Sequence, residues 1–118
     1  MQLLADTGTE PHDNPGLGWV KGKVVKIENI PFRIPHMGWN SIDVKKENYY
    51  KNILQKDFYF IHSYHFVPVD KGVIAATASY GIEVVASIQQ ENIFATQFHP
   101  EKSQEAGLSV LKTFFDNA

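Results

Sequence analysis

The 118 residues are enough for one domain with a buried core, and 43% hydrophobic and 20% charged residues are ordinary for a globular protein. The formal net charge of -2 lacks the basic surplus that attracts nucleic acids or anionic membranes, and no apolar run is long enough to span a bilayer. The chain contains no cysteine, which excludes disulfides, thiolate metal sites and thiol catalysis by its own residues. The first residues lack the basic and long apolar segments of a secretory signal, so a cytoplasmic location is expected.

Alternating apolar residues predict several strands between two helical ends. Strands are expected over residues 19–28, 58–66 and 72–81, and a short strand is expected to begin near Met37 or Trp39. Residues 83–98 are expected to form two further strands, joined as a hairpin around residues 90–92. Residues 1–5 are expected to end a helix, 6–18 to form a loop, and 45–57 to hold a short helix. This order indicates a strand-rich α/β or α+β domain.

A final helix is predicted after Ser103, whose side chain can cap it, with Glu105 in the first turn. Its apolar stripe follows helical spacing and comprises Leu108, Val110, Leu111, Phe114 and Phe115.

The motif "FHPEKS" lies where an apolar strand is expected to end. His99 is followed by Pro100, which stops the strand, and Glu101 comes two residues after His99. A carboxylate on one imidazole nitrogen fixes the tautomer and leaves the other nitrogen as a base, as in hydrolase triads. The alternative is an ordinary histidine and glutamate in an exposed turn, because motifs of this length also occur by chance.

Two other motifs have a functional and a structural interpretation. In "FIHSYHF", His62 and His65 suggest a zinc site with His99, but residues three apart point to opposite faces of a strand, so aromatic core packing is favoured. In "PHMGWN", Met37 and Trp39 favour a partner contact if they are exposed, whereas a loop tucked against the core is the structural alternative.

Taken together, "MQLLA", "GLGW", "PHMGWN", "YFIHSYHF", "ATASYG" and "ATQFHPEKSQEAGLSVLKTF" resemble the class I, triad-type glutamine amidotransferases. The resemblance runs from Met1 to about Phe115. "PHMGWN" and "HSY" are most similar to the glutaminase subunits of imidazole glycerol phosphate synthase, from histidine biosynthesis. The resemblance implies an α/β, flavodoxin-like amidotransferase domain with a C-terminal helix.

The resemblance also implies chemistry and site residues. A cysteine in a Gly-x-Cys-x-Gly elbow attacks the glutamine amide, forms a thioester and releases ammonia, with His99 as the base and Glu101 holding its tautomer. The implied substrate contacts are Gln2, Glu10, Ser63 and Tyr64. The implied contacts with a (β/α)8-barrel cyclase partner, which receives the ammonia, are Met37, Trp39, Tyr59 and Lys102. No cofactor and no metal are implied.

Departures from the family pattern leave the ammonia acceptor open. "GLGWVKG" differs from the commoner family sequence, and His65 stands where tyrosine is more usual. Paralogous subunits supply an enzyme that amidates surface polysaccharides, and this acceptor is an alternative to the cyclase.

The family elbow places its cysteine three residues before the Met-Gln pair that opens this chain. We therefore expect residues 1–118 to be a partial amidotransferase domain that lacks the N-terminal half with the nucleophile elbow, and to be inactive alone. A non-catalytic fragment that binds the cyclase is the alternative. Missing strands would leave apolar faces and an unpaired edge, so the isolated chain is expected to be marginally stable or oligomeric.

Overall fold

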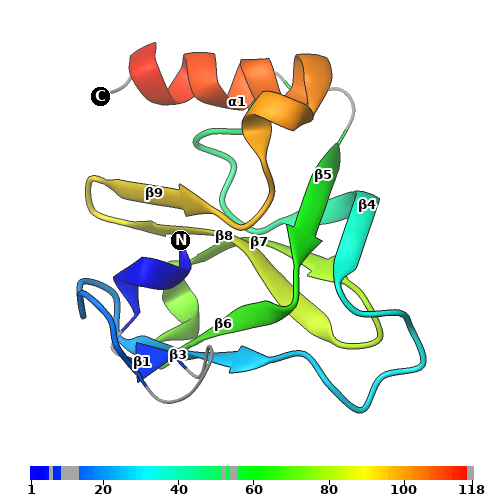
Figure 1. Ribbon diagram of the computed structural model, residues 1–118. Helices are drawn as coiled ribbons and strands as arrows, with labels where there is room; N and C mark the ends of the chain where they lie inside the picture. Colours follow the sequence, from blue (N-terminus) through cyan, green and yellow to red (C-terminus); the bar gives the residue numbers. More distant parts are fainter. Residues whose placement is uncertain (6, 9–13, 52, 54–55, 117–118) are drawn as a thin grey trace.

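Two β-sheets and one C-terminal helix make up the fold in the computed structural model, which describes residues 1–5, 7–8, 14–51, 53 and 56–116 (Figure 1). In chain order the elements are η1 (Gln2–Leu4), β1 (Thr7–Gly8), β2 (Asn14–Pro15), β3 (Gly22–Lys26), β4 (His36–Val44), β5 (Asp57–His62), β6 (Tyr64–Pro68), η2 (Lys71–Val73), β7 (Ile74–Ser79), β8 (Glu83–Gln90), β9 (Ile93–Thr96), η3 (Pro100–Lys102) and α1 (Gln104–Asp116). The η elements are single 3-10 turns. The strand-rich order with a C-terminal helix was predicted from the sequence.

The strands divide between a four-stranded sheet of order β2-β1-β3-β6 and a five-stranded sheet of order β5-β4-β7-β8-β9. All the pairs in the larger sheet are antiparallel, and the hairpin of β8 and β9 confirms the predicted one. One apolar cluster packs between the larger sheet and helix α1, as Figure 1 shows from the helix lying across that sheet. A second cluster lies by the smaller sheet and η1.

The predicted single strand over residues 58–66 is wrong, because the chain changes sheets at Ser63. Strand β5 pairs with β4 in the larger sheet, whereas β6 pairs with β3 in the smaller one. The Ser63 carbonyl accepts a hydrogen bond from the Ile27 N–H, 2.9 Å away, which is outside both strand ladders. Composition did not reveal the break, since the aromatic residues and Ile61 on either side of it favour strand structure. The consequence is that residues 62–64 form a corner between the two sheets.

Two helical predictions also need correction. Residues 48–51 form a turn and none of the described residues of 45–57 is in a helix, because buried Tyr50 and Ile53 anchor the segment in the larger core. The predicted apolar stripe of helix α1 is buried only in part: Gly107 and Val110 are the buried residues of the helix, whereas Leu108 and Phe115 are exposed. Their spacing is helical, but they lie outside the part of the helix that faces the sheet. None of the described helices combines the length and the apolar character needed to cross a membrane.

Candidate active site

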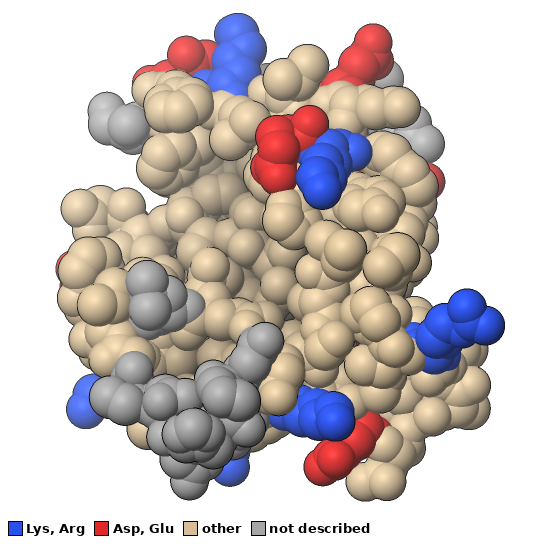
Figure 2. Space-filling view, viewed as in Figure 1, with Lys and Arg blue, Asp and Glu red and all other residues tan. Residues whose placement is uncertain are grey.

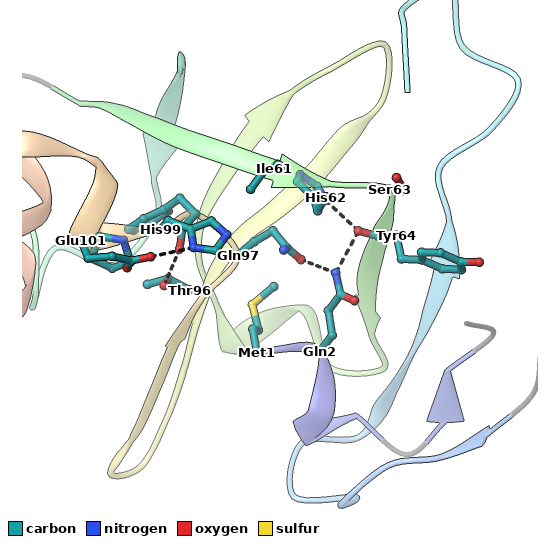
Figure 3. Close-up of a pocket in the computed structure, with 12 residues that line it drawn as sticks. Met1, Gln2, Ile61, His62, Ser63, Tyr64, Thr96, Gln97, His99 and Glu101 are labelled. Carbon is teal, nitrogen blue, oxygen red and sulfur yellow. Dashed lines mark hydrogen bonds and ion pairs between the residues drawn. The ribbon is translucent and has the colours of Figure 1, made fainter. Parts of the chain in front are cut away.

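A pocket of about 540 Å³ lies where η1, the corner at residues 62–64 and the end of β9 meet. Its lining includes Gln2, His62, Ser63, Tyr64, Gln97, His99 and Glu101 (Figure 3). Figure 2 shows that the middle of this face is hollowed and mostly uncharged, with adjoining acidic and basic side chains just above the hollow and others near the outline of the molecule. Segments far apart in the sequence thus bring amide, imidazole and carboxylate groups to one cavity.

His99 and Glu101 form a hydrogen-bonded pair at this pocket. The Nδ1 atom of His99 lies 2.7 Å from Oε1 of Glu101. Both side chains are partly exposed, at 38% and 60%. The backbone N–H of Glu101 and then the hydrogen bond from His99 lower the pKa of the Glu101 carboxyl group. The carboxylate therefore favours the tautomer with a proton on Nδ1, which leaves Nε2 of His99 available as a base.

Hydrogen bonds between β5 and the turn η3 hold His99 in place. The His99 N–H donates to the Tyr59 carbonyl at 2.9 Å. The Tyr59 N–H donates to the Ser103 hydroxyl at 3.0 Å, and that hydroxyl donates to the His99 carbonyl at 2.7 Å. The prediction that the Ser103 side chain caps the helix is therefore wrong, because its hydroxyl bonds β5 and His99. Helix α1 does begin directly after Ser103, with Glu105 in its first turn.

Replacing Ser103 with alanine is expected to destabilise the protein by about 1–3 kcal/mol, because Ser103 is only 1% exposed and loss of its hydroxyl leaves two backbone groups without this partner. Denaturant unfolding monitored by fluorescence gives the change in unfolding free energy. The exposed Ser79, replaced with alanine, is the matched control and should change it by less than about 0.5 kcal/mol. An equal effect of both substitutions would contradict the role of the Ser103 hydroxyl.

Gln2 reaches across the pocket from η1. Its Nε2 group donates to Oε1 of Gln97 at 2.7 Å and to the Tyr64 carbonyl at 3.0 Å. Figure 3 shows the Tyr64 ring pointing away from these residues, so Tyr64 faces Gln2 through its backbone. Ser63 also lines the pocket, whereas Glu10 lies outside the described residues. The sequence did not single out Gln97, although it lies two residues before His99 on the same segment.

The partner contacts expected from the sequence gather on the outer side of β4 and β5. Met37 is 57% exposed and Trp39 50% exposed, so the alternative of a loop tucked against the core is wrong for these side chains. Trp39 pairs with Tyr59 across the two strands, and their rings meet edge to face at 6.1 Å. The Lys102 ammonium lies 5.9 Å from the centre of the Tyr59 ring. We call these four residues the outer strip.

A pair of buried histidines lies on the inner side of the same two strands. Nδ1 of His36 is 2.8 Å from Nε2 of His62. Burial lowers the pKa of both imidazoles, and that of His36 falls to about 4 with a further contribution from His62. Burial also lowers the pKa of His65. The sequence suggested His62 only as a metal ligand with His65 and His99, and no cluster of metal-binding side chains is found among the described residues.

Acid is expected to destabilise the protein through His36. The unfolded chain takes up this proton near the ordinary pKa of 6.5, whereas the folded protein does so only near 4. The stabilisation is therefore complete above about pH 6.5 and is lost as the pH falls towards 4, by up to about 3 kcal/mol. Denaturant unfolding at pH 7 and pH 4.5 measures how steeply the free energy of unfolding depends on pH. His36→Asn should flatten it, and an unchanged slope in that variant would contradict the assignment.

Comparison with known proteins places this sequence in a family. The profile of the family described as glutamine amidotransferase class-I matches residues 1–118. Among curated relatives, the imidazole glycerol phosphate synthase subunit HisH of Pelagibacter ubique is 48% identical over 98% of this chain and 58% of its own length. The subunit HisH of Pyrococcus furiosus is 49% identical over 97% of this chain and 59% of its own length. The chain thus spans somewhat more than half the length of these relatives.

A solved structure agrees with the fold. A protein from Thermoplasma acidophilum, described as one of the subunits of a GMP synthase, superposes with a TM-score of 0.60 over 80% of this chain and 47% of its own, at 21% identity. That similarity shows the fold alone, and it confirms the expected amidotransferase-like α/β architecture. Because the family profile covers all 118 residues, the chain belongs to the class I glutamine amidotransferases.

Proposed function

We propose that the complete protein containing these residues hydrolyses glutamine to glutamate and ammonia and passes the ammonia to a cyclase subunit. The observation on which this rests is the pair of His99 and Glu101, 2.7 Å apart at the pocket. The names of the relatives, subunits of imidazole glycerol phosphate synthase, support the choice of this pathway over the surface-polysaccharide alternative.

The proposed reaction needs a cysteine, which these 118 residues do not contain. We propose that residues 1–118 form the C-terminal part of the amidotransferase domain and that the thiol comes from another part of the complete protein. His99 takes the thiol proton as sulfur attacks the amide carbon of glutamine, and gives it to the departing nitrogen, which leaves as ammonia. Water, deprotonated by His99, then cleaves the thioester to glutamate and restores the thiol. Glu101 keeps the proton on Nδ1 throughout.

We assign recognition of the substrate to the opposite wall of the pocket. The Gln2 side chain, whose NH2 group donates to Gln97 and to the Tyr64 carbonyl, is left with its Oε1 atom as an acceptor for the glutamine side chain. Ser63 lines the same wall, and Glu10 is proposed as a further contact from the family resemblance. A few fixed polar groups in a cavity of this kind set the orientation of a small substrate.

The partner is proposed to dock on the outer strip. Met37 and Trp39 offer exposed apolar and aromatic area, which is enriched at protein interfaces, and Lys102 adds a charge beside Tyr59. Lys102 is the last residue of the turn η3, which begins directly after His99. A partner bound here would therefore lie close to the site where ammonia forms.

Glutamate release by the complete protein, with and without the cyclase, tests the function. The expected result is glutamine-dependent glutamate formation with ammonia incorporated by the cyclase, and a loss of binding to the cyclase in Trp39→Ala. Absence of glutamate with a folded protein and its cyclase would contradict the glutaminase proposal. Glutamate without incorporation by the cyclase would contradict only the proposed acceptor and favour the polysaccharide-amidating alternative.

A further inference from the structure

A continuous chain of hydrogen bonds leads from the inner side of β4 to the pocket. Asn40 Nδ2 is 3.1 Å from Nε2 of His36, and Nδ1 of His36 is 2.8 Å from Nε2 of His62. Nδ1 of His62 is in turn 2.7 Å from the Tyr64 carbonyl oxygen. That same oxygen accepts the hydrogen bond from Gln2. Figure 3 shows its pocket end, where His62 and Gln2 converge on the Tyr64 oxygen.

The two ends of this chain fix where its protons lie. The Tyr64 oxygen can only accept, so Nδ1 of His62 must hold a proton, and Nε2 of the neutral ring is then an acceptor. Nδ1 of His36 must therefore donate to it, which leaves Nε2 of His36 to accept from Asn40. Independently, Asn40 presents its NH2 group here, because the same nitrogen donates to the Ser79 carbonyl at 2.9 Å. The proton positions deduced from the Tyr64 carbonyl at one end therefore agree with the orientation of the Asn40 amide at the other.

The surroundings of the pair favour this neutral arrangement. His36 is 2% exposed and is stacked between the rings of Phe60, at 4.7 Å, and Tyr80, at 4.1 Å. The titratable groups acting on His62 besides His36 are His65 and His99, both of which would be positive if protonated. A second proton on His62 would also set two N–H groups against each other at the contact with His36. The bond to the Tyr64 carbonyl by itself raises the pKa of His62, but burial, the largest effect, outweighs it and lowers the pKa, so the His62 ring is neutral.

We propose that His62, which accepts a hydrogen bond from His36, is a positioning residue that fixes the Tyr64 carbonyl and thereby the Gln2 amide at the glutamine pocket. This inference rests on the proposed function for the identity of the substrate. At the corner between the sheets the Tyr64 oxygen takes a hydrogen bond from each side, from His62 and from Gln2. If the His62 bond is lost, the corner and the Gln2 side chain are less restrained, and glutamine binds more weakly. His99 is held separately by Tyr59, so its chemistry should change little.

Steady-state kinetics of the complete protein with its cyclase tests the proposal through a matched pair of variants. His62→Leu removes the donor at similar size and is expected to raise KM for glutamine about tenfold, with kcat changed by less than about twofold. His62→Asn keeps an N–H donor near the position of Nδ1 and is expected to recover most of the loss. His65→Asn is the control, since this neighbouring, half-buried imidazole lies outside the chain of hydrogen bonds.

Nitrogen NMR of ¹⁵N-histidine in the unmodified complete protein gives a second readout that does not depend on variants folding. At neutral pH, His36 and His62 should both be neutral and protonated on Nδ1. A proton on Nε2 of either ring would overturn the proposal, as would an unchanged KM or a selective fall of kcat in folded His62→Leu. These results would leave the proposed function intact provided glutamate is released. A complete protein that releases no glutamate would instead contradict the function, and the positioning role with it.

Discussion

Replacing His99 with alanine in the complete protein is expected to lower the rate of glutamate release at least about 10³-fold. The imidazole is proposed to take the thiol proton and to give it to the departing amide nitrogen, and loss of a general base of this kind removes factors of about 10² to 10⁴ or more. The side chain is partly exposed and bonds to Glu101, which is itself an exposed residue, so folding should be little affected. Glutamate formation at saturating glutamine, in the presence of the cyclase, measures the rate.

Two comparisons make the His99 result interpretable. Glu101→Gln keeps a side chain of the same shape but removes the charge that sets the tautomer, so it should reduce kcat without abolishing it. His65→Ala removes a nearby histidine to which no role in the reaction is assigned, and it should leave kcat within about threefold. Glutamate release by folded His99→Ala at the unmodified rate would refute the assignment of the base.

The sequence predicted the local elements better than the way they pair. The hairpin of 83–98 and the C-terminal helix follow from alternation and spacing that a short window contains, and both are confirmed. The division of 58–66 between two sheets was missed, because the change depends on partners in β3 and β4 that lie elsewhere in the chain. Pairing of this kind is a tertiary property, and local propensity carries no information about it.

The same distinction applies to the site. His99 and Glu101 are two residues apart, so the sequence alone suggested their pairing, and the distance of 2.7 Å agrees with it. His36 and His62 are 26 residues apart, and only the register of β4 on β5 sets them opposite each other. Alternation along β4 also explains why Met37 and Trp39 face outward while His36 faces inward. Family resemblance supplied the substrate contacts, which residue types alone did not indicate.

Gly107→Ala is expected to destabilise the protein by about 3 kcal/mol or more and to reduce glutamate release as well. A Cβ atom at this position would overlap the Pro100 carbonyl oxygen and lie 2.7 Å from the Pro100 carbonyl carbon and 2.9 Å from Cβ of Ser103. These neighbours are backbone and a buried side chain, so helix α1 or the turn η3 must move. Since Pro100 directly follows His99, such a movement would also displace the proposed base.

Helix propensity alone predicts the opposite sign for this substitution. Alanine is favoured over glycine inside a helix by about 1 kcal/mol, so Gly107→Ala would be stabilising if the helix were free of η3. Denaturant unfolding therefore decides between the two effects. Gly8→Ala is the matched control, because its Cβ would meet only Cβ of Val24, at an ordinary contact distance of 3.7 Å. A gain in stability for Gly107→Ala would mean that α1 and η3 are not packed together closely enough to hold His99.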